Sequence, residues 1–205
     1  MTAIINYGVG NLFSLTGSLK HLGIDAIVTN DPDEIRRAER IILPGVGAFA
    51  DAKQKLLDTG LVPVLNEEVK NGKPLLGICL GMQMLFEKSY EYGEHSGLGY
   101  IKGDICPLNE DIPDNMKVPH IGWNKLIIKD KNNPLLKYTN EGDYVYYVHS
   151  FYGKNCDDAL VAYSEYHVNV PGIVCNKNVF GTQFHPEKSG EVGLNMLKAF
   201  CEVKA

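Results

Sequence analysis

A single α/β domain, with a mostly parallel central sheet that carries helices on both faces, is predicted by two features of the 205-residue sequence. In the first half, short apolar runs alternate with segments of helical periodicity. Apolar runs separated by helices are typical of parallel strands that are buried on both faces. In the second half the strand-like runs lie too close together for crossover helices, so we expect antiparallel additions to the sheet there.

The first half is expected to alternate strands and helices. The periodicity predicts strands at residues 3–5, 24–28, 40–43 and 75–78. It predicts helices at residues 11–23, 48–57, 62–71 and about 82–90. Gly23 and Gly72 follow two of these helices and suit their C-terminal ends, because glycine readily adopts the left-handed conformation found there.

The second half is richer in loops. Residues 109–117 and 129–143 are polar and interrupted by proline, and strands are expected at 143–148, 159–166, 172–175 and 179–184. A last helix, at about 192–203, has one apolar face made of Val192, Met196, Ala199 and Phe200. Because no repeat or linker interrupts the chain, we expect one domain over residues 1–205.

Composition narrows the class of function. A net charge of −5 argues against nucleic acid as the main ligand. The five cysteines include no CxxC pair, so neither a disulfide framework nor a metal site is expected. The N-terminal sequence lacks the pattern of a signal peptide, and no apolar run has the length of a membrane span. A cytoplasmic enzyme or binding protein is the expectation.

The segment Gly77-Ile78-Cys79-Leu80-Gly81 has the spacing of a nucleophile elbow, with cysteine in place of serine. Such an elbow places the sulfur at the N-terminus of the following helix, where unpaired N–H groups stabilise a thiolate. The N–H of Leu80 would then be one oxyanion-hole donor. The alternative is a small buried hydrophobe, and we expect that role for the remaining cysteines Cys106, Cys156, Cys175 and Cys201.

The segment Phe184-His185-Pro186-Glu187 offers the base that a cysteine nucleophile needs and a group to orient it. In an extended segment, residues i and i+2 share one face, so we expect His185 and Glu187 to point the same way. A histidine before proline is most often structural, but its coincidence with the cysteine elbow favours a catalytic triad.

Together these motifs resemble the class I, triad-type glutamine amidotransferases, whose GxCxGxQ and xQFHPE motifs read GICLGMQ and TQFHPE here. The resemblance spans essentially the whole chain. It implies a nucleophile at Cys79, a glutamine-binding Gln83, and a triad completed by His185 and Glu187. It also implies hydrolysis of the glutamine side-chain amide through a γ-glutamyl thioester. No cofactor is implied.

Further segments are similar to the family of glutaminase subunits of imidazole glycerol phosphate synthase. They are NYGVGNLFS at residues 6–14, LPGVGAF at 43–49, VPHIGWN at 118–124 and YYVHSFY at 146–152. In one departure, Asn6 stands where that family usually has aspartate, which puts a charged contact there in doubt. The chain has no nucleotide-binding motif, so the ammonia must be used by a separate polypeptide. In that family the partner is a (βα)8-barrel cyclase, which forms a heterodimer with the glutaminase.

This second resemblance also implies individual residue roles. It places the second oxyanion donor at Val46 and Gly47, where flanking glycines allow a peptide plane to flip. It implies partner contacts by Asn11, Trp123 and Lys188, although Trp123 could also be a core residue. The substrate-binding residues that it implies are Gly47, Gln83, Glu91, His149, Ser150 and Phe151.

Other functions are also compatible with parts of the sequence. A stand-alone γ-glutamyl hydrolase on the same fold would be active without a partner, but it gives no reason for the HIGWN segment. A paralogous subunit feeding a different synthase, for example in surface-sugar modification, would share every motif. A regulatory binding subunit is disfavoured by the intact Cys79, His185 and Glu187.

Overall fold

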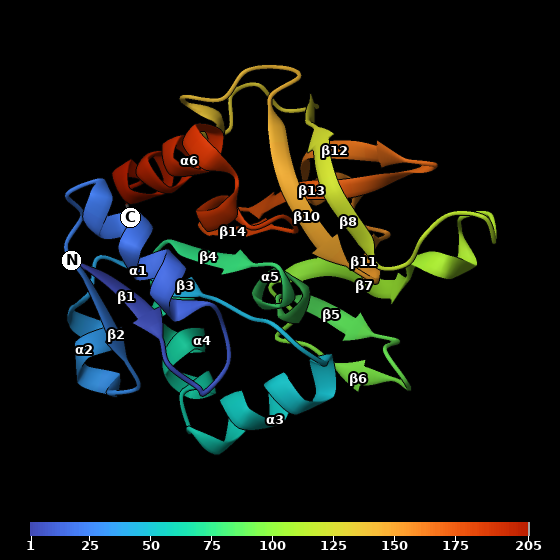
Figure 1. The fold of residues 1–205 in the computed structure, drawn as a ribbon. Coiled ribbons are helices and arrows are strands. Elements are labelled where there is room, and N and C mark those ends of the chain that lie inside the picture. The colour runs from blue at the N-terminus through green and yellow to red at the C-terminus, as the bar shows by residue number, and fades with distance from the viewer. Residues whose placement is uncertain (205) are drawn as a thin grey trace.

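A computed structural model describes residues 1–204 and confirms the α/β prediction (Figure 1). The main sheet consists of β1 (Thr2–Ile5), β2 (Ala26–Thr29), β3 (Arg40–Leu43), β4 (Leu75–Ile78), β9 (Ile127–Ile128), β12 (Leu160–Tyr166), β13 (Val168–Asn176) and β14 (Val179–Thr182). Its order is β2-β1-β3-β4-β14-β13-β12-β9. The pairings from β2 to β14 are parallel, and β13, β12 and β9 extend this part with antiparallel pairings.

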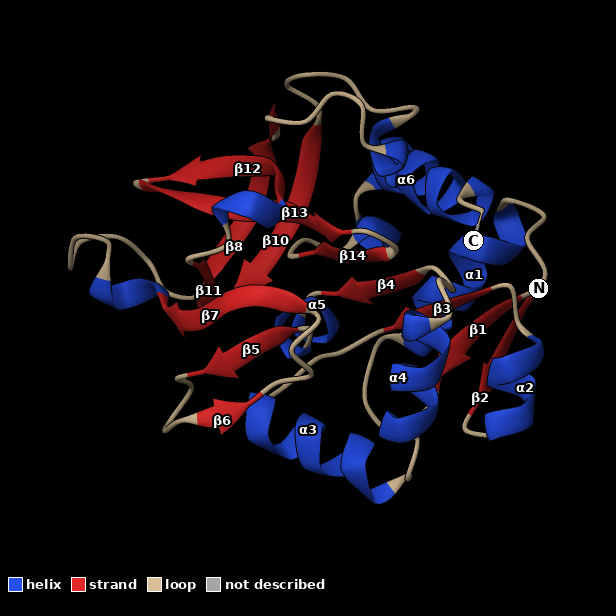
Figure 2. Cartoon of the chain, turned by 180° about the vertical axis from the view of Figure 1, so that it is seen from behind, coloured by secondary structure: helices blue, strands red, loops and turns tan. Residues whose placement is uncertain are grey.

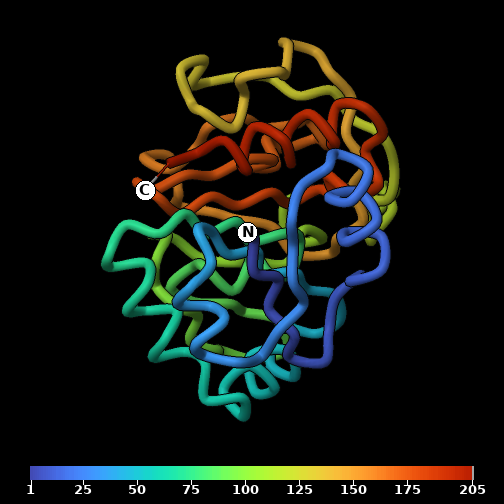
Figure 3. The backbone as a smooth tube through the Cα atoms, turned by 90° about the vertical axis from the view of Figure 1, so that its left-hand side faces the viewer, coloured from blue at the N-terminus to red at the C-terminus, as the bar shows by residue number. Residues whose placement is uncertain are grey.

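Helices cover both faces of the parallel part of the sheet, as Figures 1 and 3 show. On one face lie α1 (Leu12–His21) and α6 (Gly190–Glu202), and on the other lie α2 (Pro32–Arg37), α3 (Phe49–Asp58) and α4 (Val62–Lys70). Within β1, Ile4 belongs to the core under α1 and α6, whereas Ala3 and Ile5 belong to the core under the other three helices. Successive side chains of a strand point to opposite faces, so one short apolar run serves two cores.

Two smaller sheets, built from residue 86 onward, lie beside the main one (Figure 2). β8 (His120–Lys125) and β10 (Tyr144–His149) form an antiparallel pair in which His149 lies opposite His120. A four-stranded sheet has the order β11-β7-β5-β6, from β11 (Phe151–Lys154), β7 (Ile101–Pro107), β5 (Phe86–Ser89) and β6 (His95–Ser96). Short 3-10 turns are η1 (Leu108–Glu110), η2 (Pro134–Leu136), η3 (Asp157–Ala159) and η4 (Pro186–Lys188).

The predicted helix at about 82–90 is wrong. The helix after Cys79, α5, runs only over Leu80–Met84, and residues 86–89 form β5. Phe86 and Ser89 are buried while Glu87 and Lys88 between them are exposed, a spacing that mimics one turn of an amphipathic helix. Pairing of β5 with β7 in the smaller sheet decides in favour of the strand.

The other predicted elements occur close to their expected bounds, with β2 beginning two residues later than predicted, at Ala26, and β13 extending to Val168–Asn176. β8, β9 and β11 and the four-stranded sheet were not predicted. Among residues 1–204, no helix combines the length and apolar character needed to cross a membrane.

Candidate active site

Cys79 occupies a strained turn between β4 and α5. Its φ of 54° lies in the left-handed region, which for a residue with a side chain costs about 1–3 kcal/mol and persists only when the surroundings enforce it. The Cys79 N–H donates to Thr182 O at 2.7 Å, and the Cys79 carbonyl accepts from the Gln83 N–H at 3.0 Å. These bonds to β14 and to the first turn of α5 hold the thiol at the carboxyl end of the sheet.

The glycines around Cys79 allow the backbone to pack without side chains. A Cβ atom on Gly81 would lie 1.9 Å from Leu43 O, and one on Gly77 would lie 2.7 Å from Gly81 O. On the facing loop, a Cβ on Gly45 would lie 2.6 Å from Gly81 N. The elbow is therefore in backbone contact with the loop that follows β3, which the sequence pattern alone did not reveal.

His185 and Glu187 form the predicted pair, with His185 Nδ1 and Glu187 Oε1 2.8 Å apart. The geometry differs from the expected one, because Pro186–Lys188 forms the 3-10 turn η4 and not an extended strand. Since Nδ1 donates to the carboxylate, the other ring nitrogen, Nε2, is left for the sulfur. Burial lowers the pKa of His185, but hydrogen bonds with Cys79 and Glu187 outweigh it and raise that pKa to about 10. The site thus favours the imidazolium form of His185.

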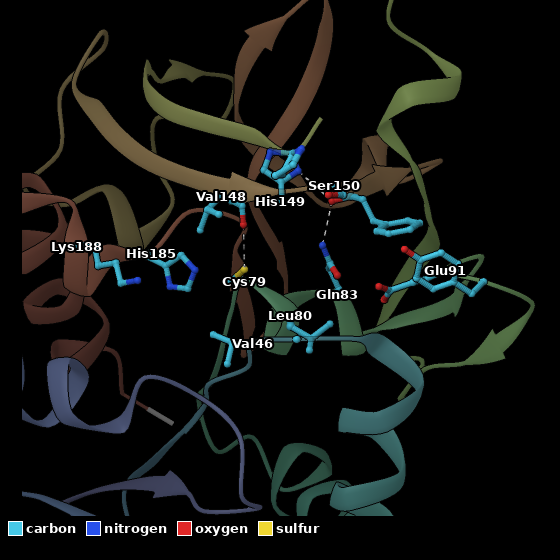
Figure 4. Close-up of a pocket in the computed structure, with 14 residues that line it drawn as sticks. Val46, Cys79, Leu80, Gln83, Glu91, Val148, His149, Ser150, His185 and Lys188 are labelled. Atoms are coloured by element: carbon cyan, nitrogen blue, oxygen red, sulfur yellow. Dashed lines mark hydrogen bonds between the residues drawn. The ribbon is translucent and has the colours of Figure 1, made fainter. Parts of the chain in front are cut away.

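Cys79 and His185 face a cavity of about 400 Å³ (Figure 4). A volume of this size is within the range of small-molecule sites. Figure 4 shows the Cys79 sulfur beside His185 and below Val148, with the Gln83 amide pointing to the cavity wall above it. The cavity is lined by Val46, Gly47, Cys79, Leu80, Gln83, Glu91, Tyr92, Pro119, Val148, His149, Ser150, Phe151, His185 and Lys188.

The residues expected at the oxyanion hole lie together. Leu80 begins α5, and the first N–H groups of a helix have no partner within it. Val46 and Gly47 line the cavity from the loop between β3 and α3, and Gly47 has a φ of 94°. At the start of this loop, the Tyr7 hydroxyl donates a short hydrogen bond to Pro44 O. Burial, and then the nearby Cys79, raise the pKa of Tyr7. Tyr7 anchors the loop and was not predicted.

The expected substrate-binding side chains all line the cavity, and two of them also hold the fold. Gln83 Nε2 donates to Phe151 O at 3.0 Å and to Gln183 Oε1 at 3.1 Å. Glu91 Oε2 accepts from the Phe49 N–H at 2.7 Å, so it caps the N-terminus of α3. Burial raises the pKa of Glu91, against the opposing effect of this hydrogen bond. One oxygen of each side chain remains for a ligand.

Two further residues contact the predicted site. Gln183 precedes the FHPE motif, is fully buried, and donates from Nε2 to Cys79 Sγ at 3.9 Å. Tyr92 is 90% exposed and packs edge-to-face on Phe151 at the cavity rim. Gln183 was visible in the TQFHPE motif, whereas nothing in the sequence around Tyr92 distinguished it.

The three residues expected to contact a partner have different local environments. Trp123 is 52% exposed and packs against Tyr146, so the alternative of a core tryptophan is wrong. Asn11 is half-buried and caps α1 by accepting from the Ser14 N–H. Lys188 is exposed at the cavity edge, in η4 next to Glu187. Asn6 accepts from the Gly8 N–H within its own turn.

Comparisons with known proteins agree with this geometry. The family model described as glutamine amidotransferase class-I matches residues 3–203. The imidazole glycerol phosphate synthase subunit HisH of Caldanaerobacter subterraneus is 50% identical over 204 residues, covering 99% of this chain and 98% of the relative. The same subunit of Wolinella succinogenes is 47% identical over 206 residues, covering 99% of this chain and 100% of the relative.

Solved structures share the fold at low identity. PurLQS from Thermotoga maritima has a TM-score of 0.75 at 21% identity, covering 98% of this chain and 96% of the other. The glutaminase domain of Trypanosoma brucei CTPS, solved with bound acivicin, has a TM-score of 0.68 at 15% identity, covering 100% and 94%. With the elbow, the His185–Glu187 pair and near full-length identity of about half, the chain belongs to the class-I glutamine amidotransferase family and, within it, to the HisH subunits of imidazole glycerol phosphate synthase.

Proposed function

We propose that this chain hydrolyses the side-chain amide of L-glutamine to glutamate and ammonia, and that it supplies the ammonia to a cyclase subunit. In the reaction of that complex, imidazole glycerol phosphate and an aminoimidazole carboxamide ribotide are formed in histidine biosynthesis. The observation that carries the proposal is the strained Cys79 elbow, which shares one cavity with the buried His185–Glu187 pair. A cytoplasmic location fits this role.

Acylation begins with attack of the Cys79 thiolate on the amide carbon of glutamine. The carbonyl oxygen gains negative charge, and the N–H of Leu80 and a peptide N–H of the Val46–Gly47 segment stabilise it. His185 then donates a proton to the leaving nitrogen, which departs as ammonia. Glu187 keeps the imidazole oriented and favours its charged form.

Deacylation uses the same residues in reverse order. The neutral His185 removes a proton from water, the resulting hydroxide attacks the thioester carbonyl, and the Cys79 thiolate leaves. Glutamate is released from a pocket whose polar groups can bind its α-ammonium and α-carboxylate groups. The Glu91 carboxylate and the Gln83 side-chain oxygen are acceptors for an ammonium group, and Ser150 can donate to a carboxylate.

A partner surface is supported by exposed apolar side chains on β8, β10 and α1. Ile121, Trp123 and Tyr144 are 59%, 52% and 55% exposed, and Phe13, two residues after Asn11, is 90% exposed. Large apolar residues exposed at the surface are typical of protein interfaces. We propose that this face, with Asn11, Trp123 and Lys188, binds the (βα)8-barrel cyclase as a heterodimer.

The test combines purified chain with its candidate cyclase and the nucleotide substrate of the cyclase, and follows cyclised product. With glutamine as the nitrogen source, Cys79→Ala should abolish product, while ammonium salts should restore it. The matched control is Cys175→Ala, which removes another thiol and should retain turnover. Glutamine hydrolysis that needs no partner and extends to γ-glutamyl peptides would support the stand-alone hydrolase instead. Activity only with a sugar-modifying synthase would support the paralogue.

A further inference from the structure

A line of hydrogen bonds runs from β8 to the wall of the glutamine cavity. His120 Nε2 lies 2.8 Å from Asn124 Oδ1, and His120 Nδ1 lies 2.9 Å from His149 Nε2. His149 Nδ1 lies 3.0 Å from Phe151 O. Both histidines are almost fully buried, at 1% and 5% exposure. Of the two rings, only that of His149 lines the cavity, so the His120 side chain reaches it through the hydrogen bond to His149.

The same Phe151 carbonyl connects this line to the nucleophile. Gln83 Nε2 donates to Phe151 O at 3.0 Å and to Gln183 Oε1 at 3.1 Å, and Gln183 Nε2 donates to Cys79 Sγ at 3.9 Å. Phe151 O therefore accepts from the histidine side and from the helix that follows Cys79. Residues 149–151, which turn from β10 into β11, are held from both sides.

Counting hydrogens fixes the tautomers of the two rings. Phe151 O can only accept, so His149 carries its hydrogen on Nδ1 and its Nε2 accepts from His120 Nδ1–H. In the neutral pair, His120 then has no hydrogen on Nε2, and Asn124 must offer its NH₂ group there. In the protonated pair, His120 carries a hydrogen on Nε2 as well. Asn124 Oδ1 then accepts from it, while Asn124 Nδ2 donates to Glu165 O at 3.2 Å.

When the pair takes up a third hydrogen, the surroundings place it on His120 and not on His149. Burial lowers the pKa of both rings, for His149 to about 3, while the bond with Asn124 partly raises the pKa of His120. The His120 ring is stacked between Tyr147, at 5.1 Å, and Tyr166, at 3.9 Å, an arrangement that favours a cation. The titratable groups facing the pair are Tyr147 of β10, Tyr166 of β12 and His185 after β14.

We propose that His120 is a positioning residue, which acts through His149 to fix residues 149–151 against bound glutamine, and whose protonation is linked to the orientation of the Asn124 amide. The identity of the ligand rests on the function proposed above. β8 carries Trp123 on its opposite side, so the same strand joins the proposed partner face to the wall of the cavity. The geometry assigns to HIGWN a role within the glutaminase as well as at its surface.

The first test reads the rings directly and needs no activity. Side-chain ¹⁵N NMR of the isolated chain should show both His120 and His149 as Nδ1–H tautomers at neutral pH. Asn124→Asp places a fixed acceptor opposite His120 Nε2 and should raise the pH at which His120 takes up its proton. A His149 found as the Nε2–H tautomer, or a His120 titration unchanged by Asn124→Asp, would overturn the proposal.

The second test uses the complex with its cyclase. His120→Phe keeps a ring between the two tyrosines but removes both hydrogen bonds, and it should raise KM for glutamine roughly tenfold or more with a smaller change in kcat. The control, His21→Phe, makes the same change at an exposed position on α1 and should leave KM unchanged. Equal KM values for His120→Phe and wild type would refute the positioning role. Absence of glutamine turnover in the wild-type complex would instead refute the proposed function.

Discussion

Glu187 contacts the active site through His185. One carboxylate oxygen, Oε1, lies 2.8 Å from His185 Nδ1, and both side chains are 3% exposed. Within the described residues, the other oxygen, Oε2, is buried without a hydrogen-bond partner. Any effect of Glu187 on chemistry should therefore pass through the orientation and charge of the imidazole. The role of Glu187 thus differs from that proposed for His185, which is to transfer the proton.

We expect His185→Ala and Glu187→Gln to lower kcat unequally. Loss of the proton carrier should cost on the order of 10⁶ and loss of the orienting carboxylate on the order of 10⁴, as in hydrolytic triads that act as a unit. The double variant should be no slower than His185→Ala alone. Single-turnover glutamine hydrolysis in the liganded complex measures all three. Losses that multiply in the double variant would show that the two residues do not act together.

Alkylation should label Cys79 before any other cysteine. Burial raises the pKa of Cys106, Cys175 and Cys201, and it raises that of Cys156 to about 12. Cys79 alone has an imidazolium partner, and the thiolate is the reactive form. Mass spectrometry after brief treatment with a glutamine-like electrophile identifies the labelled site. His185→Ala should slow labelling of Cys79, and uniform labelling of all five cysteines would contradict the elbow assignment.

Glutaminase activity should be low in the isolated chain and should rise by about 10²–10³ when the cyclase binds its own ligand, the range that one oxyanion donor contributes. The proposed switch is the peptide between Val46 and Gly47, which can turn because Gly47 tolerates a φ of 94°. Ammonia that forms when no acceptor is bound is protonated to ammonium and lost, so it is an advantage to keep glutamine hydrolysis slow until the cyclase has bound its ligand. Rates of the chain alone, with the unliganded cyclase and with the liganded cyclase would test it. Three equal rates would exclude a gate.

Stability should fall in acid through His149. Its pKa is about 3 in the fold, below the ordinary value of 6.5, so the unfolded chain binds the extra proton first. The unfolding free energy should therefore decrease as the pH falls from about 6.5 towards 3, by at most about 1.4 kcal/mol per pH unit for one group. His185 has the opposite sign, because its pKa is raised and its contribution is lost between about 6.5 and 10.

The variant for this measurement is His149→Gln, with the exposed His21→Gln as the matched control. Urea unfolding at several pH values should give a shallower acid slope for His149→Gln and an unchanged slope for His21→Gln. An acid slope that His149→Gln leaves as steep as in wild type would mean that another buried group controls acid unfolding.

The sequence predicted the parallel core because its strands are continuous apolar runs, and it predicted the triad because both motifs are local. The strand β5 was mistaken for helix because Phe86 and Ser89 are spaced like one helical turn, and only pairing with β7 distinguishes the two. The bonds of Tyr7 to Pro44 and of His120 to His149 join residues distant in the chain, so no local pattern could indicate them.

The near contact of Gly45 with Gly81 limits how the oxyanion loop can move. Because the backbones of loop and elbow pack closely at this point, and Tyr7 holds Pro44 beside it, an outward swing of the whole loop would have to break both contacts. Local rotation of the peptides after Gly45 breaks neither contact. Loop motions of this kind take nanoseconds to microseconds, whereas enzymes typically turn over in milliseconds or longer. The two loop states would therefore interconvert many times in each catalytic cycle. The rate of glutamine hydrolysis would then measure the fraction of molecules in the competent state, and progress curves should start without a lag when the cyclase ligand is added.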